Sequence, residues 1–138
     1  SLSSSSHDIR IFSEEKVQIV NGDSKKIRQL FGNLVNNAIK YSPDGGPIEI
    51  RITEHNNRVT VALTDYGIGI PSSAMSELFQ KFYRVDNSDT RQIGGTGLGL
   101  SICREIARAH DGEIHVESIE GQGSTFTVDL PLNPTPPL

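Results

Sequence analysis

The strongest constraint on the fold of this 138-residue chain is that two pairs of short segments alternate apolar and polar residues about a turn. Such alternation is typical of strands that bury one face, and a short Asn- or Gly-rich turn between two of them predicts a β-hairpin. The first pair is residues 48–53 and 59–63 about Asn56 and Asn57, and the second is residues 113–118 and 124–130 about Gly121, Gln122 and Gly123. A sheet built from two hairpins needs other elements to cover its apolar face.

Helical spacing of apolar residues predicts that cover. Residues 24–41 and 98–109 carry the two strongest helical patterns, and residues 72–83 carry a shorter one that begins after Pro71. Proline is favoured at a helix start, and Gly112 is placed to end the last helix in the left-handed conformation.

The remaining apolar stretches are short. Residues 9–12 and 17–20 suit extended segments at a sheet edge, and Asp23 is placed to cap the helix that follows. The order is then strand, helix, strand pair, helix, loop, helix, strand pair. We predict an α+β fold, a two-layer α/β sandwich whose mixed, mostly antiparallel sheet carries three helices on one face.

Size and composition indicate one domain. The length suffices for a single core, and the one cysteine, Cys103, cannot form an intrachain disulfide, which fits a reduced, cytoplasmic compartment. We expect residues 9–131 to form the domain, residues 1–8 and 132–138 to be disordered, and the isolated domain to be a monomer. A net charge of −4 with 13 dispersed basic residues argues against nucleic-acid binding. No apolar run approaches the roughly 20 residues of a membrane helix, so we expect no membrane contact by this domain.

Glycines at positions 95, 97 and 99 alternate with other residues just before the last helical pattern. Backbone without side chains can approach a ligand closely, and the N–H groups at a helix start attract anions, so a phosphate-rich ligand is the first hypothesis. The run lacks the lysine of the phosphate loop, and its third glycine comes one residue too early for the dinucleotide fingerprint. On this run alone, a flexible connecting loop is an equal alternative.

Asn33, Asn37 and Lys40 share one face of the helix predicted at residues 24–41. Two carboxamide oxygens and an ammonium suit Mg²⁺ and the phosphates that it neutralises. Asparagine forms helices less well than alanine or glutamate, which favours a role other than helix formation. A solvated polar helix face is the alternative.

Asp65 ends a predicted strand and precedes Gly67 and Gly69, where the chain bends tightly. A carboxylate at this place can accept a hydrogen bond from an exocyclic amine of a planar ring. An aspartate that merely starts a turn is the alternative.

Four motifs, in this order and at these separations, resemble the N, G1, F and G2 boxes of sensor histidine kinases. They are Asn33-Leu34-x-x-Asn37-Ala38-x-Lys40-Tyr41-Ser42, Asp65-x-Gly67-x-Gly69-Ile70, Phe79-x-x-Phe82-Tyr83-Arg84 and Gly95-Thr96-Gly97-Leu98-Gly99-Leu100. The resemblance implies the catalytic ATP-binding domain of such a kinase, in the GHKL superfamily. It also implies the Bergerat fold, shared with DNA gyrase and heat-shock chaperone ATPases, and a mobile ATP lid over about residues 71–97.

The resemblance implies roles for individual residues, with ATP and Mg²⁺ as cofactors. Asp65 would accept the adenine amino proton, Asn37 would bind Mg²⁺, and Asn33 would support the metal and the phosphates. The other implied positions are Gly67, Gly69 and Ile70 around adenine, Lys40 and Tyr41 beside the phosphates and ribose, Arg84 at the γ-phosphate, Gly95, Thr96, Gly97, Leu98, Gly99 and Leu100 in the lid and at the helix start, and Thr125 beside adenine on the last strand.

One position favours phosphoryl transfer over hydrolysis. The related ATPases carry a glutamate, the base for water, four residues before the metal-binding asparagine, and Asn33 at that place cannot take a proton. The resemblance thus implies an ATP:protein-histidine phosphotransferase whose partners are the dimerisation and phosphoacceptor domain of its parent kinase and a response regulator. A regulatory nucleotide-binding module, or an ATPase or serine kinase of the same superfamily, is the alternative.

His7 lies in a sequence that superficially resembles an acceptor motif, but Phe12 stands where that motif has proline. Too few residues precede the first helix to form the acceptor hairpin. We expect His7 to belong to a frayed terminus and the domain not to autophosphorylate alone.

Overall fold

The computed structural model describes residues 7–13, 24–80 and 99–131. Its elements are β1 (His7–Ser13), α1 (Ser24–Lys40), β2 (Gly46–His55), β3 (Arg58–Asp65), the 3₁₀ helix η1 (Ser72–Glu77), α3 (Gly99–Ala109), β4 (Glu113–Ile119) and β5 (Gly123–Pro131). The strands form one five-stranded sheet in the order β1-β2-β3-β5-β4, with β1 parallel to β2 and all other neighbours antiparallel. The predicted sandwich with a mixed, mostly antiparallel sheet is confirmed.

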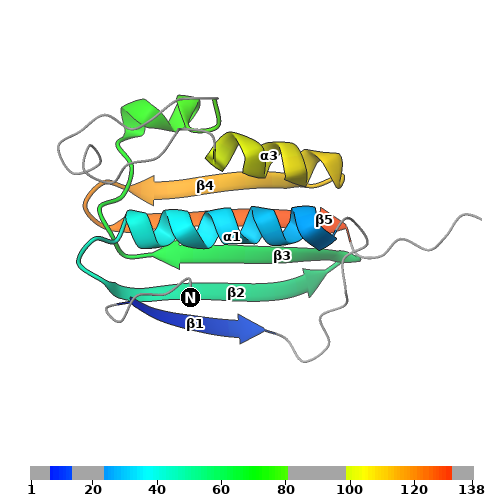
Figure 1. The fold of residues 1–138 in the computed structure, drawn as a ribbon, viewed down its shortest axis with the longest axis horizontal. Coiled ribbons are helices and arrows are strands. Elements are labelled where there is room, and N and C mark those ends of the chain that lie inside the picture. The colour runs from blue at the N-terminus through cyan, green and yellow to red at the C-terminus, as the bar shows by residue number, and fades with distance from the viewer. Residues whose placement is uncertain (1–6, 14–23, 81–98, 132–138) are drawn as a thin grey trace, which may run out of the picture.

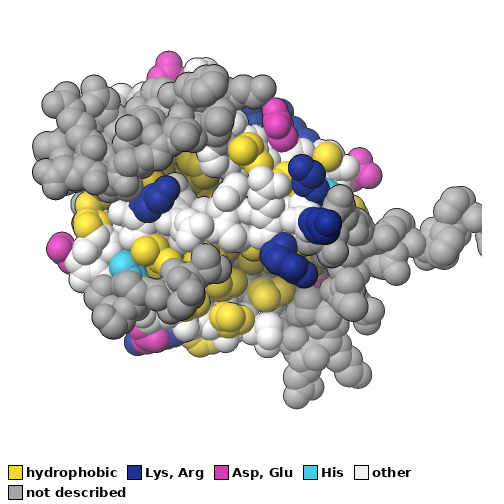
Figure 2. Space-filling view, in the orientation of Figure 1, with side chains coloured by type: hydrophobic (Ala, Val, Ile, Leu, Met, Phe, Trp, Pro, Cys, Tyr) yellow, Lys and Arg dark blue, Asp and Glu magenta, His cyan; other side chains and the backbone are white. Residues whose placement is uncertain are grey.

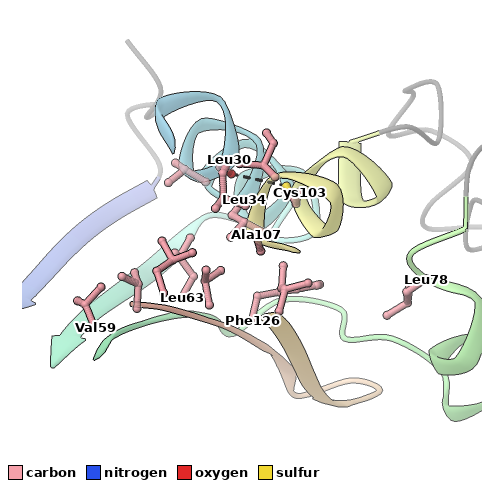
Figure 3. Close-up of a cluster of buried hydrophobic side chains, with 14 of the residues drawn as sticks. Leu30, Leu34, Val59, Leu63, Leu78, Cys103, Ala107 and Phe126 are labelled. Carbon is pink, nitrogen blue, oxygen red and sulfur yellow. Dashed lines mark hydrogen bonds between the residues drawn. The ribbon is translucent and has the colours of Figure 1, made fainter. Parts of the chain in front are cut away.

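Both α-helices lie across one face of the sheet and bury their apolar stripes against it (Figure 1). Figure 3 shows this core, with Leu30, Leu34, Cys103 and Ala107 on the helices and Val59, Leu63 and Phe126 on the strands. Burial alternates along the whole of β3, so Asp65 continues the row of buried apolar side chains that Val59 and Leu63 begin. The fold therefore places a carboxylate where the pattern predicts an apolar residue.

The two predicted hairpins are confirmed. Asn56 and Asn57 have φ angles of 51° and 61°, which are typical of a type I′ turn between β2 and β3. Gly121, in the turn between β4 and β5, has a φ angle of 85°, and Gly123, the first residue of β5, has a φ angle of 124°. These conformations favour asparagine and glycine because neither suffers greatly from a positive φ.

The α-helix predicted at residues 72–83 is wrong in type, because the chain forms a 3₁₀ helix that ends at Glu77. Pro71 precedes it in an extended conformation, and Ala74 is its one buried residue. Serines at positions 72, 73 and 76 favour local hydrogen bonds over an α-helix. Leu78 just after it is buried in the core, and Met75 and Phe79 pack against that core, so the segment buries its apolar side without forming an α-helix.

The left-handed cap predicted at Gly112 is wrong by one residue, because Asp111 takes that conformation with a φ angle of 60°. Gly112 is needed for space: a Cβ there would lie 2.1 Å from the carbonyl oxygen of Asp129. The Gly112 N–H donates to the carbonyl of Ala107 at 2.8 Å, which closes the end of α3 against β5.

β1 lies at the sheet edge as predicted, but it begins earlier than expected. His7 and Asp8 pair with the first two residues of β2, and His7 Nε2 lies 2.8 Å from the carbonyl oxygen of Ser42. Disorder through residue 8 and a frayed His7 are therefore not what the structure shows. The predicted segment 17–20, the cap at Asp23, most of the predicted lid (residues 81–97) and the C-terminal tail lie outside the described residues. Neither described α-helix has the length and apolar character needed to cross a lipid bilayer.

Candidate functional site

Asp65 ends β3 on the helix-covered face with 3% of its surface exposed. Its Oδ1 accepts a hydrogen bond from the Gly67 N–H at 3.0 Å. Burial raises the pKa of the carboxyl to about 6, although backbone hydrogen bonds from Gly67 and Ser124 oppose that shift. At neutral pH Asp65 is therefore mostly ionised and can only accept hydrogen bonds.

The glycine loop after Asp65 lies directly against the C-terminal end of α1. A Cβ at Gly67 would lie 1.8 Å from the carbonyl oxygen of Tyr41 and 2.7 Å from Ser42 Oγ, so a larger residue does not fit. The Ile68 N–H donates to the same Tyr41 carbonyl at 2.9 Å. The structure thus brings together Tyr41 and Gly67, two of the predicted site residues.

The other side of this loop is joined to the hairpin of β4 and β5. The Gly121 N–H donates to the carbonyl of Ile68 at 2.7 Å, and the Ile70 N–H donates to Ser118 Oγ at 2.8 Å. Gly69 has a φ angle of 70°, and a Cβ there would lie 2.3 Å from a backbone oxygen of β4. The loop that carries Gly67, Gly69 and Ile70 is therefore fixed between α1 and the last hairpin.

Ser124, and not Thr125, shares the face of Asp65. Ser124 is directly opposite Asp65 in the register of β5 and β3, and it is 4% exposed. Thr125 is opposite Thr64, with their Oγ1 atoms 2.9 Å apart, and side-chain alternation puts this pair on the other face. The adenine role predicted for Thr125 stays a prediction, and Ser124 is a residue that sequence reasoning missed. Its signal was a polar residue in line with the buried apolar residues of β5.

The polar face of α1 lies beside its apolar stripe. Asn33 and Asn37 are half-buried and Lys40 is exposed. Burial raises the pKa of the Cys103 thiol in α3 to about 12, and a side-chain hydrogen bond from Asn33 opposes this shift. Cys103 also lies 3.6 Å from the carbonyl oxygen of Leu30 (Figure 3). Asn33 is thus held at the interface between α1 and α3.

The exposed side of α1 is basic. Its charged residues are Lys25, Lys26, Arg28 and Lys40, with no acidic residue in the helix. Figure 2 shows basic side chains standing out on the helix-covered face above mostly uncharged surface. This arrangement favours an anionic ligand near α1.

The described part of the glycine run begins at the start of α3. Gly99 is exposed and a Cβ there would meet no atom within 4 Å, while Leu100 packs against the core. The other predicted positions in this region lie outside the described residues: Arg84, Gly95, Thr96, Gly97 and Leu98.

A cavity of about 580 Å³ opens at the ends of β3, β4 and β5, and its lining includes Asp65, Ser118, Ser124, Met75 and Val116. Its volume falls in the range of roughly 300–1,000 Å³ that is usual for small-molecule sites. Hydrogen-bond acceptors beside apolar side chains suit a flat ring that carries donor groups.

The described residues contain no group of three His, Cys, Asp or Glu side chains that could hold a metal ion. Asn33 and Asn37 offer amide oxygens only, which is a weak donor set without further ligands. Mg²⁺ takes few protein ligands and keeps water and phosphate oxygens. These residues therefore fit a Mg²⁺ that arrives with a nucleotide.

Comparison with known proteins agrees with this geometry. Residues 22–134 match the family described as histidine kinase-, DNA gyrase B- and HSP90-like ATPase. The sensor histidine kinase WalK of Bacillus subtilis (strain 168) is 46% identical over 111 residues, which cover 79% of this chain and 18% of WalK. The chain therefore spans less than a fifth of that relative.

Solved structures show the same similarity. The mycobacterial sensor histidine kinase MprB superposes with a TM-score of 0.82 and 27% identity, over 95% of this chain and 87% of that one. A structure of the catalytic domain of histidine kinase ThkA superposes with a TM-score of 0.79 and 32% identity, over 94% of this chain and 82% of that one.

Proposed function

The chain belongs to the family of histidine kinase-, DNA gyrase B- and HSP90-like ATPases, and from that membership we propose that it is the part of a sensor histidine kinase that binds Mg-ATP and donates its γ-phosphate to a histidine. The acceptor lies on a dimerisation and phosphoacceptor domain of the parent kinase, and a response regulator receives the phosphoryl group next. We place the domain in the cytoplasm, where ATP is supplied.

The buried Asp65 beside its fixed glycine loop is the observation that carries the nucleotide assignment. An ionised carboxylate that is 3% exposed and takes hydrogen bonds only from backbone N–H groups among the described residues has capacity for another donor. The adenine amino group supplies that donor. Gly67 and Gly69 let the loop lie against α1 and β4 beneath the base, and Ile70 anchors it in the core.

The phosphates lie toward α1 in this proposal. Asn37 binds Mg²⁺, which supplies charge neutralisation on the phosphates when bound, with Asn33 in support. Lys40 and Tyr41 lie beside the phosphates and ribose, Arg84 reaches the γ-phosphate, and the lid and the start of α3 surround the phosphate chain. The lid and helix residues are Gly95, Thr96, Gly97, Leu98, Gly99 and Leu100.

Transfer is favoured over hydrolysis because Asn33 cannot remove a proton from water. The lone pair of an imidazole nitrogen forms the N–P bond, the bond from the γ-phosphorus to the β,γ-bridging oxygen breaks, and ADP leaves with that electron pair. The residues of this domain position ATP and stabilise charge, which is most of what phosphoryl transfer requires.

The test mixes this domain with the phosphoacceptor domain of its parent and γ-labelled Mg-ATP. We expect an acid-labile phosphohistidine on the acceptor, and none with Asn37→Ala, whose Mg²⁺-dependent ATP affinity should also be lost. ATP binding without labelled histidine would indicate a regulatory module. Rapid multiple turnover by the domain alone would indicate an ATPase.

A further inference from the structure

A row of three polar side chains, one from each of three neighbouring strands, lines the cavity beside Asp65. Ser118 of β4 is opposite Ser124 of β5, and Ser124 is opposite Asp65 of β3. Directly opposite residues point to the same face of a sheet, and all three residues line the cavity.

The hydrogen bonds of Ser118 determine which way the hydroxyl proton of Ser124 points. Its Oγ accepts from the Ile70 N–H at 2.8 Å, lies 2.9 Å from the Gly123 carbonyl oxygen and lies 2.8 Å from Ser124 Oγ. A carbonyl cannot donate, so the one proton of Ser118 goes to Gly123. Ser118 then has one lone pair left, and Ser124 must donate its own proton to it.

Ser124 consequently offers only lone pairs to the cavity, as the ionised Asp65 does. The Cβ atoms of directly opposite residues on neighbouring strands lie about 4.5–5.5 Å apart, so the Asp65 and Ser124 side chains rise side by side into the cavity. The two protons of a planar amine, each about 2.9 Å from nitrogen to acceptor, serve two acceptors about 5 Å apart. An oxo group in place of the amine has no proton to donate. It would place a third acceptor beside the two acceptors Asp65 and Ser124.

We propose that Ser118 determines base specificity: by holding the Ser124 proton, it makes the site accept a 6-aminopurine and reject a 6-oxopurine. The inference rests on the proposed nucleotide function and extends it to a positioning residue that acts on the base through Ser124. Ser118 also holds Ile70, so one hydroxyl couples the glycine loop to the last hairpin.

The test compares ATP with inosine triphosphate (ITP), whose base carries an oxo group at C6 and a proton at N1, by calorimetric titration. We expect the wild-type domain to prefer ATP about 100-fold or more, because a site built around a hydrogen bond rejects an analogue that cannot make it. In Ser118→Ala the Ser124 hydroxyl can turn and donate, so the ratio of the two affinities should fall at least tenfold, mainly through tighter ITP binding. Ser118→Thr keeps the hydroxyl and should restore the ratio.

Thr127→Val is the matched control, because it removes a hydroxyl from the opposite face of β5 and should leave the ratio unchanged. Equal losses of ATP and ITP affinity in Ser118→Ala would show a merely structural role and overturn the proposal. If circular dichroism shows that Ser118→Ala does not fold, Ser124→Ala decides: the ratio must fall, and an unchanged ratio overturns the proposal. A wild-type domain that binds no ATP would refute the proposed function instead.

Discussion

The strands β3 and β5 meet at two ends that each carry a carboxylate, and the two ends are built differently. At one end Asp129 pairs with Arg58 at 2.5 Å, and His115 Nε2 lies 3.6 Å from the same carboxylate. Arg58 also donates to the carbonyl of Asp111 at 3.1 Å. At the other end Asp65 is buried, and no basic side chain contributes to its pKa among the described residues.

The cluster of Arg58, Asp129 and His115 stabilises the fold, whereas Asp65 is better explained as a group that binds a ligand. The pair at the Arg58 end is partly exposed and contributes at most about 1 kcal/mol. A carboxyl pKa near 6, against the usual 3.8, means that burial disfavours the ionised form of Asp65 by roughly 2–3 kcal/mol. Folding alone favours an apolar residue at this position, so a ligand explains the carboxylate better than stability does.

The largest effect is expected where the glycine loop touches α1. Gly67→Ala would place a methyl group 1.8 Å from the Tyr41 carbonyl oxygen, and backbone on both sides must then move. We expect the free energy of unfolding to fall by about 3 kcal/mol or more in urea denaturation. Gly32→Ala in α1 is the control, because its Cβ meets nothing within 4 Å and alanine favours a helix. Equal stability of the two variants would contradict the close approach of Gly67 to the Tyr41 carbonyl oxygen.

The next effect is expected from Asp65→Asn, which should raise the free energy of unfolding at pH 8 by about 1–2 kcal/mol. Asparagine keeps an oxygen for the Gly67 N–H but removes the buried charge. The folded pKa of about 6 lies above the usual 3.8, so the contribution of Asp65 to stability is fully present below pH 3.8 and is lost as the pH rises through 6. The stability difference between the variants should therefore grow between those two values. The same variant should bind ATP at least about 100-fold more weakly. If Asp65→Asn instead lost stability and kept its ATP affinity, Asp65 would be a stabilising residue and not a binding group.

At the opposite end, Arg58→Ala should lower the free energy of unfolding by about 1 kcal/mol and leave ATP affinity unchanged. The substitution removes both the ion pair with Asp129 and the hydrogen bond to Asp111. Thermal unfolding and ATP titration on the same sample measure the two quantities. A large loss of ATP affinity would show that the two ends are not independent.

The smallest effect is expected from Arg108→Ala, which removes the exposed ion pair with Glu113 at 3.0 Å. The loss should stay within about 0.5 kcal/mol and disappear in 1 M salt, because solvent and counterions screen such pairs. A loss that persists in salt would indicate packing by the arginine stem instead.

Local patterns were enough to predict most of the fold. Alternation located both hairpins, and Asn56 and Asn57 identified a turn that depends only on neighbouring residues. The 3₁₀ helix escaped prediction because a short apolar pattern fits either helix type. The left-handed conformation of Asp111, predicted for Gly112, could not be read from the local sequence. The space that requires a glycine at position 112 is limited by β5, which follows later in the chain.

The candidate site was only partly predictable for the same reason. Asp65, Gly67 and Gly69 stand in a contiguous motif, but the partners that fix them come from α1 and β4. Ser118 and Ser124 acquire their roles only when the register of β4, β5 and β3 places them in one row. A sequence shows that two core-facing strand positions are polar, but not that one hydroxyl orients the other.

The reactivity of the Cys103 thiol can report on the opening of the interface between α1 and α3. It is the only cysteine in the chain, it is fully buried, and its thiol pKa is about 12. The thiolate is the form that attacks an alkylating reagent, so the folded domain should react very slowly. Labelling should proceed through molecules in which α3 has separated from α1. The rate of alkylation under native conditions then measures how often that interface opens, without an introduced probe. A nucleotide that holds Asn33 in place should slow that reaction.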